Sequence, residues 1–434
     1  MSDDVTGVFV LPGFRVVSSD VLDDEWHLLV ETRREPTGCP TCGAVARVKD
    51  RRTVTVRDLP AGGVPVVLRW CKRIFECRYG LCEKKTWTEQ HDAIAPRVVL
   101  TDRAQQWAFE QVGHHDRAVS RVAAQLGVSW HTIMTQVVDR GTPLVEDPDR
   151  LAGVSAVGVD ETSFLRATGT RHTQYATGVA DLTPGRPPRL LDVVPGRSGR
   201  VLGDWLTDRD EAWRSAVLTA SLDPFRGYAT ALSAHLPATT RVLDAFHIVK
   251  IVLLAVDQVR RRVQQDTTGH RGRAGDPLYR VRRILRRRYD RLTDRQLVRL
   301  RAALTDADTH EEITAAWLVA QNVMQAYANP DRAAGRAAAE QVITLAKTCP
   351  VPEIARFGRT LVAWRTEYLA RFDNPALSNG PTENLNLKIK NTKRIARGYR
   401  SFANYRLRLL LNHGLIRQDQ QPARIRPHRP RLIA

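Results

Sequence analysis

Residues 155–165 read SAVGVDETSFL, an apolar run that is typical of a buried strand and reaches two acidic residues, Asp160 and Glu161. Three later segments have the same strand character: 174–182, 189–196 and 215–223. A helical pattern and one more strand follow the last of them. Several strands followed by alternating helix and strand predict a mixed α/β sheet.

The bulk composition indicates a multidomain protein with a polyanionic partner. The chain has 434 residues, too many for one ordinary core. Its 66 Lys and Arg residues outnumber 47 Asp and Glu residues, which gives a formal net charge of +19 and a pI near 10.2. Nucleic acid is therefore the leading candidate partner. An acidic membrane surface is the rival, but the longest apolar runs, such as 251–256, fall far short of the roughly 20 residues that span a bilayer.

The N-terminal residues MSDDVTG indicate the expected compartment. They are acidic and precede no apolar segment, so no signal peptide is predicted. We expect a cytoplasmic protein, in which the six cysteines would be free thiols or metal ligands rather than disulfides.

The first half of the chain divides into three segments. Residues 1–95 read as short strands with turns and contain a cluster of cysteines, which predicts a small zinc-binding β module. Residues 96–150 become helical around a compact helix, turn and helix. The mixed sheet then occupies residues 151–249, the first part of a domain whose acidic strand ends are candidate catalytic residues.

The second half of the chain is mainly helical. Strand signals are absent from residues 250–375, and we expect a helical insertion there, with one of its helices at 280–292. Residues 376–418 predict two further helices that complete the catalytic domain. The Pro- and Arg-rich tail at 419–434 is expected to be basic and disordered.

Two cysteine pairs predict a structural zinc site. Cys39 and Cys42 belong to a CPxCG turn, and Cys77 with Cys82 supplies a second pair after 34 intervening residues. Four thiolates form the tetrahedral set that zinc prefers, and a small β module gains folding free energy from such a metal. Cys71 is close enough in sequence to replace one member of the second pair. Scattered buried thiols are the other interpretation, which the rarity of the CPxCG turn disfavours.

Residues 119–140, VSRVAAQLGVSWHTIMTQVVDR, carry a helix-turn-helix pattern. Ala123 lets two helices approach, Gly127 can take the positive φ of the turn, and Ser129 can cap the second helix. That helix would present polar or planar side chains to base edges in a major groove: Ser129, Trp130, His131, Thr132, Thr135 and Gln136. Any pair of packed helices can show this spacing, but the cysteine module and the basic charge favour DNA binding.

Carboxylates at strand ends predict a divalent metal site. Asp160 ends the first strand of the sheet and Asp223 ends the segment 215–223. Carboxylates on adjacent strands can bind Mg²⁺ or Mn²⁺ through hard oxygen ligands. Asp244 ends a later strand, and the spacing of the residues does not separate it from Asp223. Each of these side chains also has a structural interpretation as a turn or cap residue.

Residues 378–402, SNGPTENLNLKIKNTKRIARGYRSF, combine a single carboxylate, Glu383, with a strongly basic helix pattern. The basic residues would position DNA phosphates: Lys388, Lys390, Lys393, Arg394, Arg397 and Arg400. Glu383 would complete a site for two metal ions, which support in-line displacement at a phosphodiester without a covalent protein nucleophile. Its structural interpretation is an acidic residue stabilised by the helix dipole.

These motifs in this order resemble the bacterial insertion-sequence transposases of the ISL3 group, over about residues 8–416. The resemblance is carried by the CPxCG module, the helix-turn-helix, GVDE at 158–161, LDPFRGY at 222–228, DAFHIVK at 244–250 and the block at 378–412. It implies an RNase H-like catalytic domain with an Asp-Asp-Glu triad: Asp160, Asp223 and Glu383. Asp244 and His247 match a motif that looks auxiliary in related transposases. Many members have Gly after the catalytic Glu, where this chain has Asn384.

The resemblance also implies a function. We expect a nucleoid-associated DNA transposase that binds the terminal inverted repeats of its own insertion sequence and catalyses metal-dependent strand cleavage and strand transfer into target DNA. Synapsis of two transposon ends implies at least a homodimer. A transposase-derived DNA-binding regulator without catalysis is the alternative, and a structure-selective nuclease or resolvase is a third.

Overall fold

The computed structural model describes residues 11–170, 172–374 and 380–416. The predicted tail at 419–434 and two residues of the basic segment, Ser378 and Asn379, lie outside the described residues. Packing divides the chain into two units: Met1–Asp147 with Ile389–Leu415, and Pro148–Lys388 with Ile416–Ala434. None of the helices in the described part of the chain combines the length and apolarity needed to cross a membrane.

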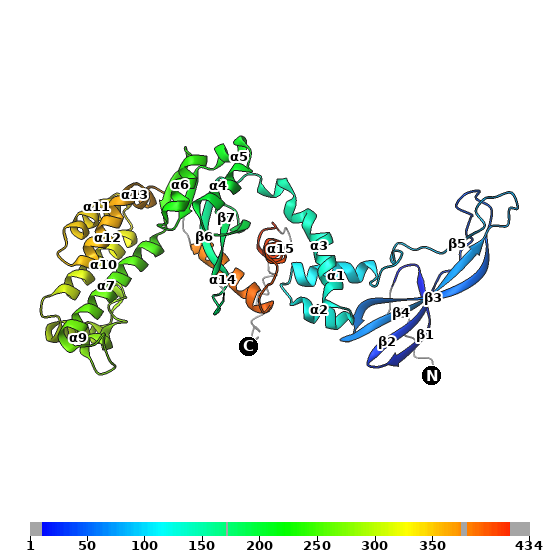
Figure 1. Ribbon diagram of the computed structural model, residues 1–434, viewed down its shortest axis with the longest axis horizontal. Coiled ribbons are helices and arrows are strands. Elements are labelled where there is room, and N and C mark those ends of the chain that lie inside the picture. The colour runs from blue at the N-terminus through cyan, green and yellow to red at the C-terminus, as the bar shows by residue number, and fades with distance from the viewer. Residues whose placement is uncertain (1–10, 171, 375–379, 417–434) are drawn as a thin grey trace, which may run out of the picture. The chain divides into compact units, whose positions relative to one another are not determined.

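The first unit begins with a five-stranded sheet of order β1-β2-β4-β3, in which β5 pairs with β4. Its strands are β1 (Phe14–Leu22), β2 (Glu25–Thr32), β3 (Arg47–Ala61), β4 (Val64–Glu76) and β5 (Thr86–Thr88). The strands β3 and β4 form a long antiparallel hairpin (Figure 1). Gly62 and Gly63 take positive φ in its turn, a conformation that favours glycine. Val30, Leu68 and Trp70 are buried in the small core of this sheet.

Four helices complete the first unit: α1 (Asp102–Gly113), α2 (Val119–Leu126), α3 (Trp130–Glu146) and α15 (Phe402–His413). Gly127 ends α2 at a φ of 63°, and the Ser129 hydroxyl accepts the Thr132 N–H at 3.1 Å to cap α3. These features confirm the predicted helix-turn-helix. The C-terminal helix α15 packs against α1 and α3, where Leu411 lies on Gly141, a packing that the sequence pattern did not predict.

The second unit contains a mixed sheet of order β10-β9-β6-β7-β8. Its strands are β6 (Ala156–Leu165), β7 (Gln174–Asp181), β8 (Arg189–Pro195), β9 (Thr219–Leu222) and β10 (Thr240–Leu243). The first three strands along the chain are antiparallel to one another, β9 runs parallel to β6, and β10 runs parallel to β9. This confirms the mixed α/β sheet expected from the run of strand-like segments.

Helices connect the strands of this sheet and then form a separate layer. The connections are α4 (Gly199–Thr207), α5 (Glu211–Ala216) and α6 (Arg226–His235). After β10 the chain forms the long helix α7 (Ala245–Thr268), then α8 (Pro277–Val281), α9 (Asp294–Ala307), α10 (Glu312–Ala328), α11 (Arg332–Thr348), α12 (Pro352–Ala363) and α13 (Arg365–Asp373). Helices α7, α10, α11 and α12 pack side by side (Figure 1). The last helix that starts in this unit is α14 (Gly380–Ile395).

The expected helix at 280–292 is wrong. Helix α8 ends at Val281, turns follow, and only a short 3₁₀ segment forms at Tyr289–Arg291. Successive arginines repel one another along a helix face, which weakens a continuous helix. Gln321 of α10 instead binds this backbone, because its side chain accepts the Tyr289 N–H at 2.6 Å and donates to the Arg287 carbonyl at 3.0 Å.

Candidate functional site

Three acidic residues lie in one row across the second-unit sheet. Val159 of β6 pairs with Leu222 of β9, and Leu222 pairs with Leu243 of β10. The next residue on each strand is acidic: Asp160, Asp223 and Asp244. Asp223 and Asp244 directly follow the ends of the parallel strands β9 and β10, at the edge where open α/β sheets commonly bind ligands. The prediction that Asp160 ends its strand is wrong, because β6 continues to Leu165 and its last residues pair with β7.

Glu383 joins this edge from the first turn of α14. Burial raises its pKa, and the charges of Asp244 and Asp223 raise it further, while His247 and Lys250 lower it. Asn386, one turn further along α14, donates to Asp160, so this part of the helix lies beside the row of aspartates. The sheet edge thus holds four acidic side chains together with His247 and Lys250.

Asp160 is the most perturbed of these carboxylates. Its side chain is buried, and burial together with the charge of Asp223 raises its pKa to about 7. The backbone N–H of Glu161 donates to Oδ1 at 2.7 Å, and the Nδ2 of Asn386 donates to Oδ2. Both carboxylate oxygens are therefore held in place before any ligand binds.

His247 lies between two of the aspartates. Its Nδ1 is 2.8 Å from Asp223 Oδ1 and 2.8 Å from Asp244 Oδ2. Burial alone would lower the pKa of His247, but hydrogen bonding and charge from the two carboxylates raise it to about 10. Potential ligand atoms of these three residues all lie within 4.8 Å of one another, and neither Asp160 nor Glu383 belongs to that group.

Asp244 also has a structural role as the N-cap of α7. Its Oδ2 accepts the backbone N–H of His247 at 3.2 Å and so caps the N-terminus of α7. Its side chain is 6% exposed, compared with 19% for Asp223. Asp223 caps no helix and is the more accessible of the two.

A glycine allows α14 to approach the sheet at this point. A Cβ atom at Gly158 would lie 2.6 Å from Thr382 Oγ1 and 2.7 Å from Leu182 Cδ1, closer than real contacts allow. Gly158 is two residues before Asp160, and Thr382 precedes Glu383. The absence of a side chain at Gly158 therefore brings the first turn of α14, with Glu383, against β6.

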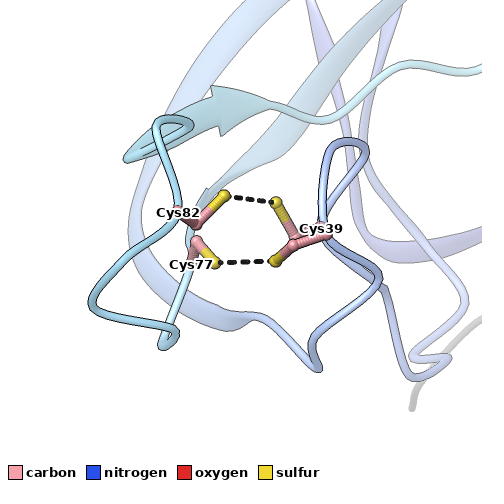
Figure 2. A group of neighbouring side chains, drawn as sticks. Cys39, Cys77 and Cys82 are labelled. Atoms are coloured by element: carbon pink, nitrogen blue, oxygen red, sulfur yellow. Dashed lines mark hydrogen bonds between the residues drawn. The ribbon is translucent and has the colours of Figure 1, made fainter.

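The first unit holds a separate cluster of four cysteines. Cys39 Sγ lies 3.8 Å from Cys82 Sγ, and Cys42 Sγ lies 3.5 Å from Cys77 Sγ (Figure 2). All four sulfurs lie within 4.8 Å of one another. Sulfurs bound to one zinc ion at about 2.3 Å are about 3.8 Å apart, whereas a disulfide needs about 2.05 Å. Cys71 does not belong to this group.

Backbone amides support the cysteine cluster. The Gly43 N–H donates to the Cys39 carbonyl at 2.9 Å, and Gly43 takes a φ of 74°, which closes the tight turn. The Tyr79 N–H donates to Cys77 Sγ at 3.4 Å. Burial would raise the pKa of Cys39, but hydrogen bonds from the backbone of Cys42 and Thr41 and from neighbouring thiols lower it to about 6. The turn thus favours a thiolate at Cys39, the form that binds zinc, whereas burial and the neighbouring thiols raise the pKa of Cys82.

The predicted DNA-contacting residues lie at the surface. Ser129, Trp130, His131 and Thr135 are exposed on α3, and Thr132 and Gln136 are partly exposed. Of the basic residues, Lys393 is partly exposed and the others are exposed: Lys388, Lys390, Arg394, Arg397 and Arg400. Lys388 belongs to the second unit, and the rest belong to the first.

Comparison with known proteins identifies the family. Residues 157–409, more than half of the chain, match the transposase domain of the ISL3 group. The chain belongs to the ISL3 transposase family. Residues 35–82 match the zinc finger of transposases of the insertion sequences IS204, IS1001, IS1096 and IS1165, and residues 89–141 match the helix-turn-helix domain of transposase family ISL3.

Known relatives of this ISL3 family member include a mycobacterial transposase. The transposase for insertion sequence element IS1557 of Mycobacterium tuberculosis is 28% identical over 348 residues, which cover 71% of this chain and 75% of that protein, in each of two strains. Among solved structures, the Drosophila P element transposase strand transfer complex has 9% identity and a TM-score of 0.40, and covers 71% of this chain and 91% of that one.

Family membership gives the individual sites a context. The zinc-finger match and the four-cysteine cluster together support a structural zinc ion in this ISL3 transposase. The helix-turn-helix match and the transposase match support a DNA transposase.

Sequence reasoning missed Asn386. It lies three residues after Glu383, on the same face of α14, and its amide binds Asp160. That spacing was visible in the sequence. It carried no signal on its own, because a lone Asn on a basic helix is commonly a solvated residue.

Proposed function

We propose that this protein transposes its own insertion sequence, binding the terminal inverted repeats and catalysing strand cleavage and strand transfer at Asp160, Asp223 and Glu383. The observation that carries the proposal is the row of Asp160, Asp223 and Asp244 on the sheet, against which α14, the helix of Glu383, packs through Thr382 and Asn386. A site rich in carboxylates suits phosphodiester chemistry with divalent metals.

The strand order supports an RNase H-like catalytic domain. In the second unit an antiparallel meander of three strands is followed by two strands that run parallel to its first strand. The helices α7 to α13 then separate this sheet from α14. They correspond to the helical insertion that the resemblance implies between the second Asp and the Glu.

The residues at the sheet edge fit divalent cations. The charge of Asp223 raises the pKa of both Asp160 and Glu383, so a cation among them would relieve mutual repulsion. Asp160, Asp223 and Glu383 would hold two Mg²⁺ or Mn²⁺ ions. Such ions would activate the attacking oxygen and stabilise the leaving oxygen during in-line displacement.

Protein groups around the triad would hold it ready for this chemistry. Asn386 and the Glu161 N–H fix the orientation of the Asp160 carboxylate. His247 positions Asp223 and is itself held by Asp244. Water would attack the phosphodiester at the transposon end, and the freed 3′-hydroxyl would then attack target DNA by the same in-line displacement.

The first unit would supply recognition of the transposon end. The exposed residues at the start of α3 would contact base edges, and the basic residues from Lys390 to Arg400 would bind phosphates, as would Lys388 of the second unit. Two transposon ends must meet in one complex, so at least a homodimer would act.

The proposal is tested by binding and cleavage on one duplex. Full-length protein is titrated against a duplex that carries the element's own terminal repeat and against an unrelated duplex of equal length, and Mg²⁺ is then added. We expect preferential binding to the terminal repeat, followed by cleavage at the element boundary. Tight, specific binding without cleavage under Mg²⁺ or Mn²⁺ would favour a DNA-binding regulator. Cleavage without sequence preference would favour a structure-selective nuclease.

A further inference from the structure

A groove of about 950 Å³ lies within the first unit, between residues that were assigned separately to base contact and to phosphate contact. Its walls come from two parts of the chain that are distant in sequence. One wall is formed by residues 115–121 at the start of α2 and by Trp130, His131 and Met134 of α3. The other is formed by residues 395–401, the segment between α14 and α15, with two residues of α15.

The groove carries uncompensated positive charge. Arg117, Arg121, Arg397 and Arg400 line it. The acidic residue of the lining, Asp116, accepts hydrogen bonds from Arg408 at 2.9 Å and from Thr392 at 2.6 Å. Its negative charge is therefore neutralised by Arg408 and does not offset the other arginines. Within the described part of the chain, no carboxylate pairs with the guanidinium groups of Arg121, Arg397 or Arg400. An anion would therefore be the natural occupant.

Arg397 occupies a backbone position that usually belongs to glycine. Its φ is 56°, and the next residue closes the end of α14 because the Gly398 N–H donates to the Lys393 carbonyl at 2.9 Å. Helices commonly end in this way with glycine or asparagine in the left-handed position. An exposed arginine there is an outlier that the turn itself does not require, which points to a role for its side chain.

The segment that carries Arg397 and Arg400 is anchored against α15. The Tyr399 ring packs edge-on against Tyr405 of α15 with a centroid distance of 5.2 Å. The Ser401 hydroxyl accepts the Asn404 N–H at 3.3 Å and caps α15. Both arginines are therefore presented from a fixed turn, which lowers the entropic cost of binding.

We propose that this groove holds the sugar-phosphate backbone of the duplex whose bases α3 contacts, with Arg397 and Arg400 on its phosphates. The inference rests on the proposed function, because the occupant is the transposon end. The groove opens beside Trp130 and His131 at the N-terminus of α3. In helix-turn-helix proteins the first helix crosses the DNA backbone next to the bases that the second helix contacts, and α2 lines this groove.

This assignment makes the role of two basic residues more specific. Arg397 and Arg400 would bind the stretch of backbone beside the bases that α3 contacts, rather than the phosphates near Glu383. The helix α14 would then carry a catalytic carboxylate in its first turn and lead directly into an end-binding turn.

The test uses full-length Arg397→Gly and Arg400→Gln proteins and measures affinity for the terminal-repeat duplex as a function of salt. Glycine suits the left-handed position, so Arg397→Gly should fold at least as well as the parent in thermal unfolding. Each variant should bind roughly three- to tenfold more weakly, and the slope of log affinity against log salt should fall by about 0.9, the loss of one phosphate contact. Hydroxyl-radical footprints should lose protection at backbone positions that flank the α3 contacts.

Arg299→Ala is the matched control, because Arg299 is an exposed arginine on α9 in the second unit. It should leave the salt slope unchanged. If the parent binds the terminal repeat specifically but Arg397→Gly and Arg400→Gln keep its slope and footprint, the groove proposal is overturned and the proposed function stands. If the parent binds terminal-repeat and unrelated duplexes equally, the proposed function fails, and with it the assignment of this occupant.

Discussion

Asp223 and Asp244 are chemically identical, but one of them caps a helix and the other does not. They follow paired residues of β9 and β10, so the sheet places them side by side. Asp244 is tied to the N-terminus of α7 through the backbone of His247, whereas Asp223 caps no helix. A sequence lists both as acidic residues at strand ends, and only the hydrogen bonds of the folded chain distinguish them.

Asn386 should be a positioning residue for Asp160. We expect Asn386→Ala to slow end cleavage by about 10- to 100-fold, because groups that orient a metal-binding carboxylate typically contribute that much. Affinity for the terminal-repeat duplex should be unchanged. Single-turnover cleavage on preformed complexes measures the rate, and Asn391→Ala, an exposed asparagine on the same helix, is the control. Equal loss in both variants would contradict the role.

Glu89 should stabilise the first unit in a pH-dependent way. Its buried carboxylate accepts hydrogen bonds from Thr32 and from the backbone and side chain of Arg73. Burial would raise the pKa of Glu89, but these hydrogen bonds hold it below its ordinary value of 4.5. Because the folded pKa is lowered, the stabilisation is present above the ordinary pKa and is lost as the pH falls through the lowered value.

The corresponding variant is Glu89→Gln. At pH 7 it should lower the free energy of unfolding by about 1.5–3 kcal/mol, the range for hydrogen bonds to a charged group. Thermal unfolding at pH 7 and below pH 4 measures the difference from the parent, which should narrow in acid. The exposed Glu35→Gln is the control. A difference that is independent of pH would show that the charge of Glu89 is not what stabilises the fold.

At the scale of elements, the cysteine turns should depend on zinc. Cys39→Ser should lower the zinc content below one ion per chain and destabilise the β module, because a small core relies on the metal. Cys71→Ser should keep a full zinc ion, since its sulfur lies outside the four-cysteine group. Elemental analysis and thermal unfolding measure both effects. One zinc ion per chain in the Cys39→Ser protein would contradict the assignment of Cys39 as a zinc ligand.

The contact between β6 and α14 should also control activity. Gly158→Ala would force Thr382 and Leu182 to move, which displaces Glu383 from Asp160. We expect cleavage to fall by about 100-fold, the effect of a displacement near 1 Å in a catalytic site, with end binding retained. Gly178→Ala on β7 is a matched control, because its nearest new contact would be an ordinary 3.7 Å. Cleavage by Gly158→Ala at the parent's rate would contradict this prediction, because it would show that α14 can move away from β6 without loss of activity.

Elements with local signals could be predicted, whereas elements defined by distant contacts could not. The cysteine turns and the helix-turn-helix carry their geometry in a few adjacent residues, such as Gly127 and Ser129, and both are present. The segment at 280–292 has helix-forming residues, but Gln321 from another helix stabilises a different backbone there. The packing of α15 on α1 and α3 likewise depends on Gly141, a small residue whose partner is 270 positions away at Leu411.

At the scale of the whole molecule, one helix belongs to both units. Residues 380–388 of α14 pack in the second unit with the sheet, and residues 389–395 pack in the first unit with the helix-turn-helix. The sequence places a carboxylate and six cations in one basic segment, which predicts DNA chemistry for the segment as a whole. It does not reveal that the cations near the end of the segment line a groove beside α3. That division arises only from tertiary packing.

The central claim is that Asp160, Asp223 and Glu383 form the catalytic triad of a transposase. The most direct measurement is Mg²⁺-dependent cleavage and strand joining on a terminal-repeat duplex by the parent, Asp160→Asn, Asp223→Asn, Asp244→Asn and Glu383→Gln proteins. We expect the Asp160, Asp223 and Glu383 variants to bind the duplex normally without cutting it, and Asp244→Asn to retain part of the activity. Cleavage by any of the three triad variants at the parent's rate, or a parent that binds tightly and never cuts, would contradict the account.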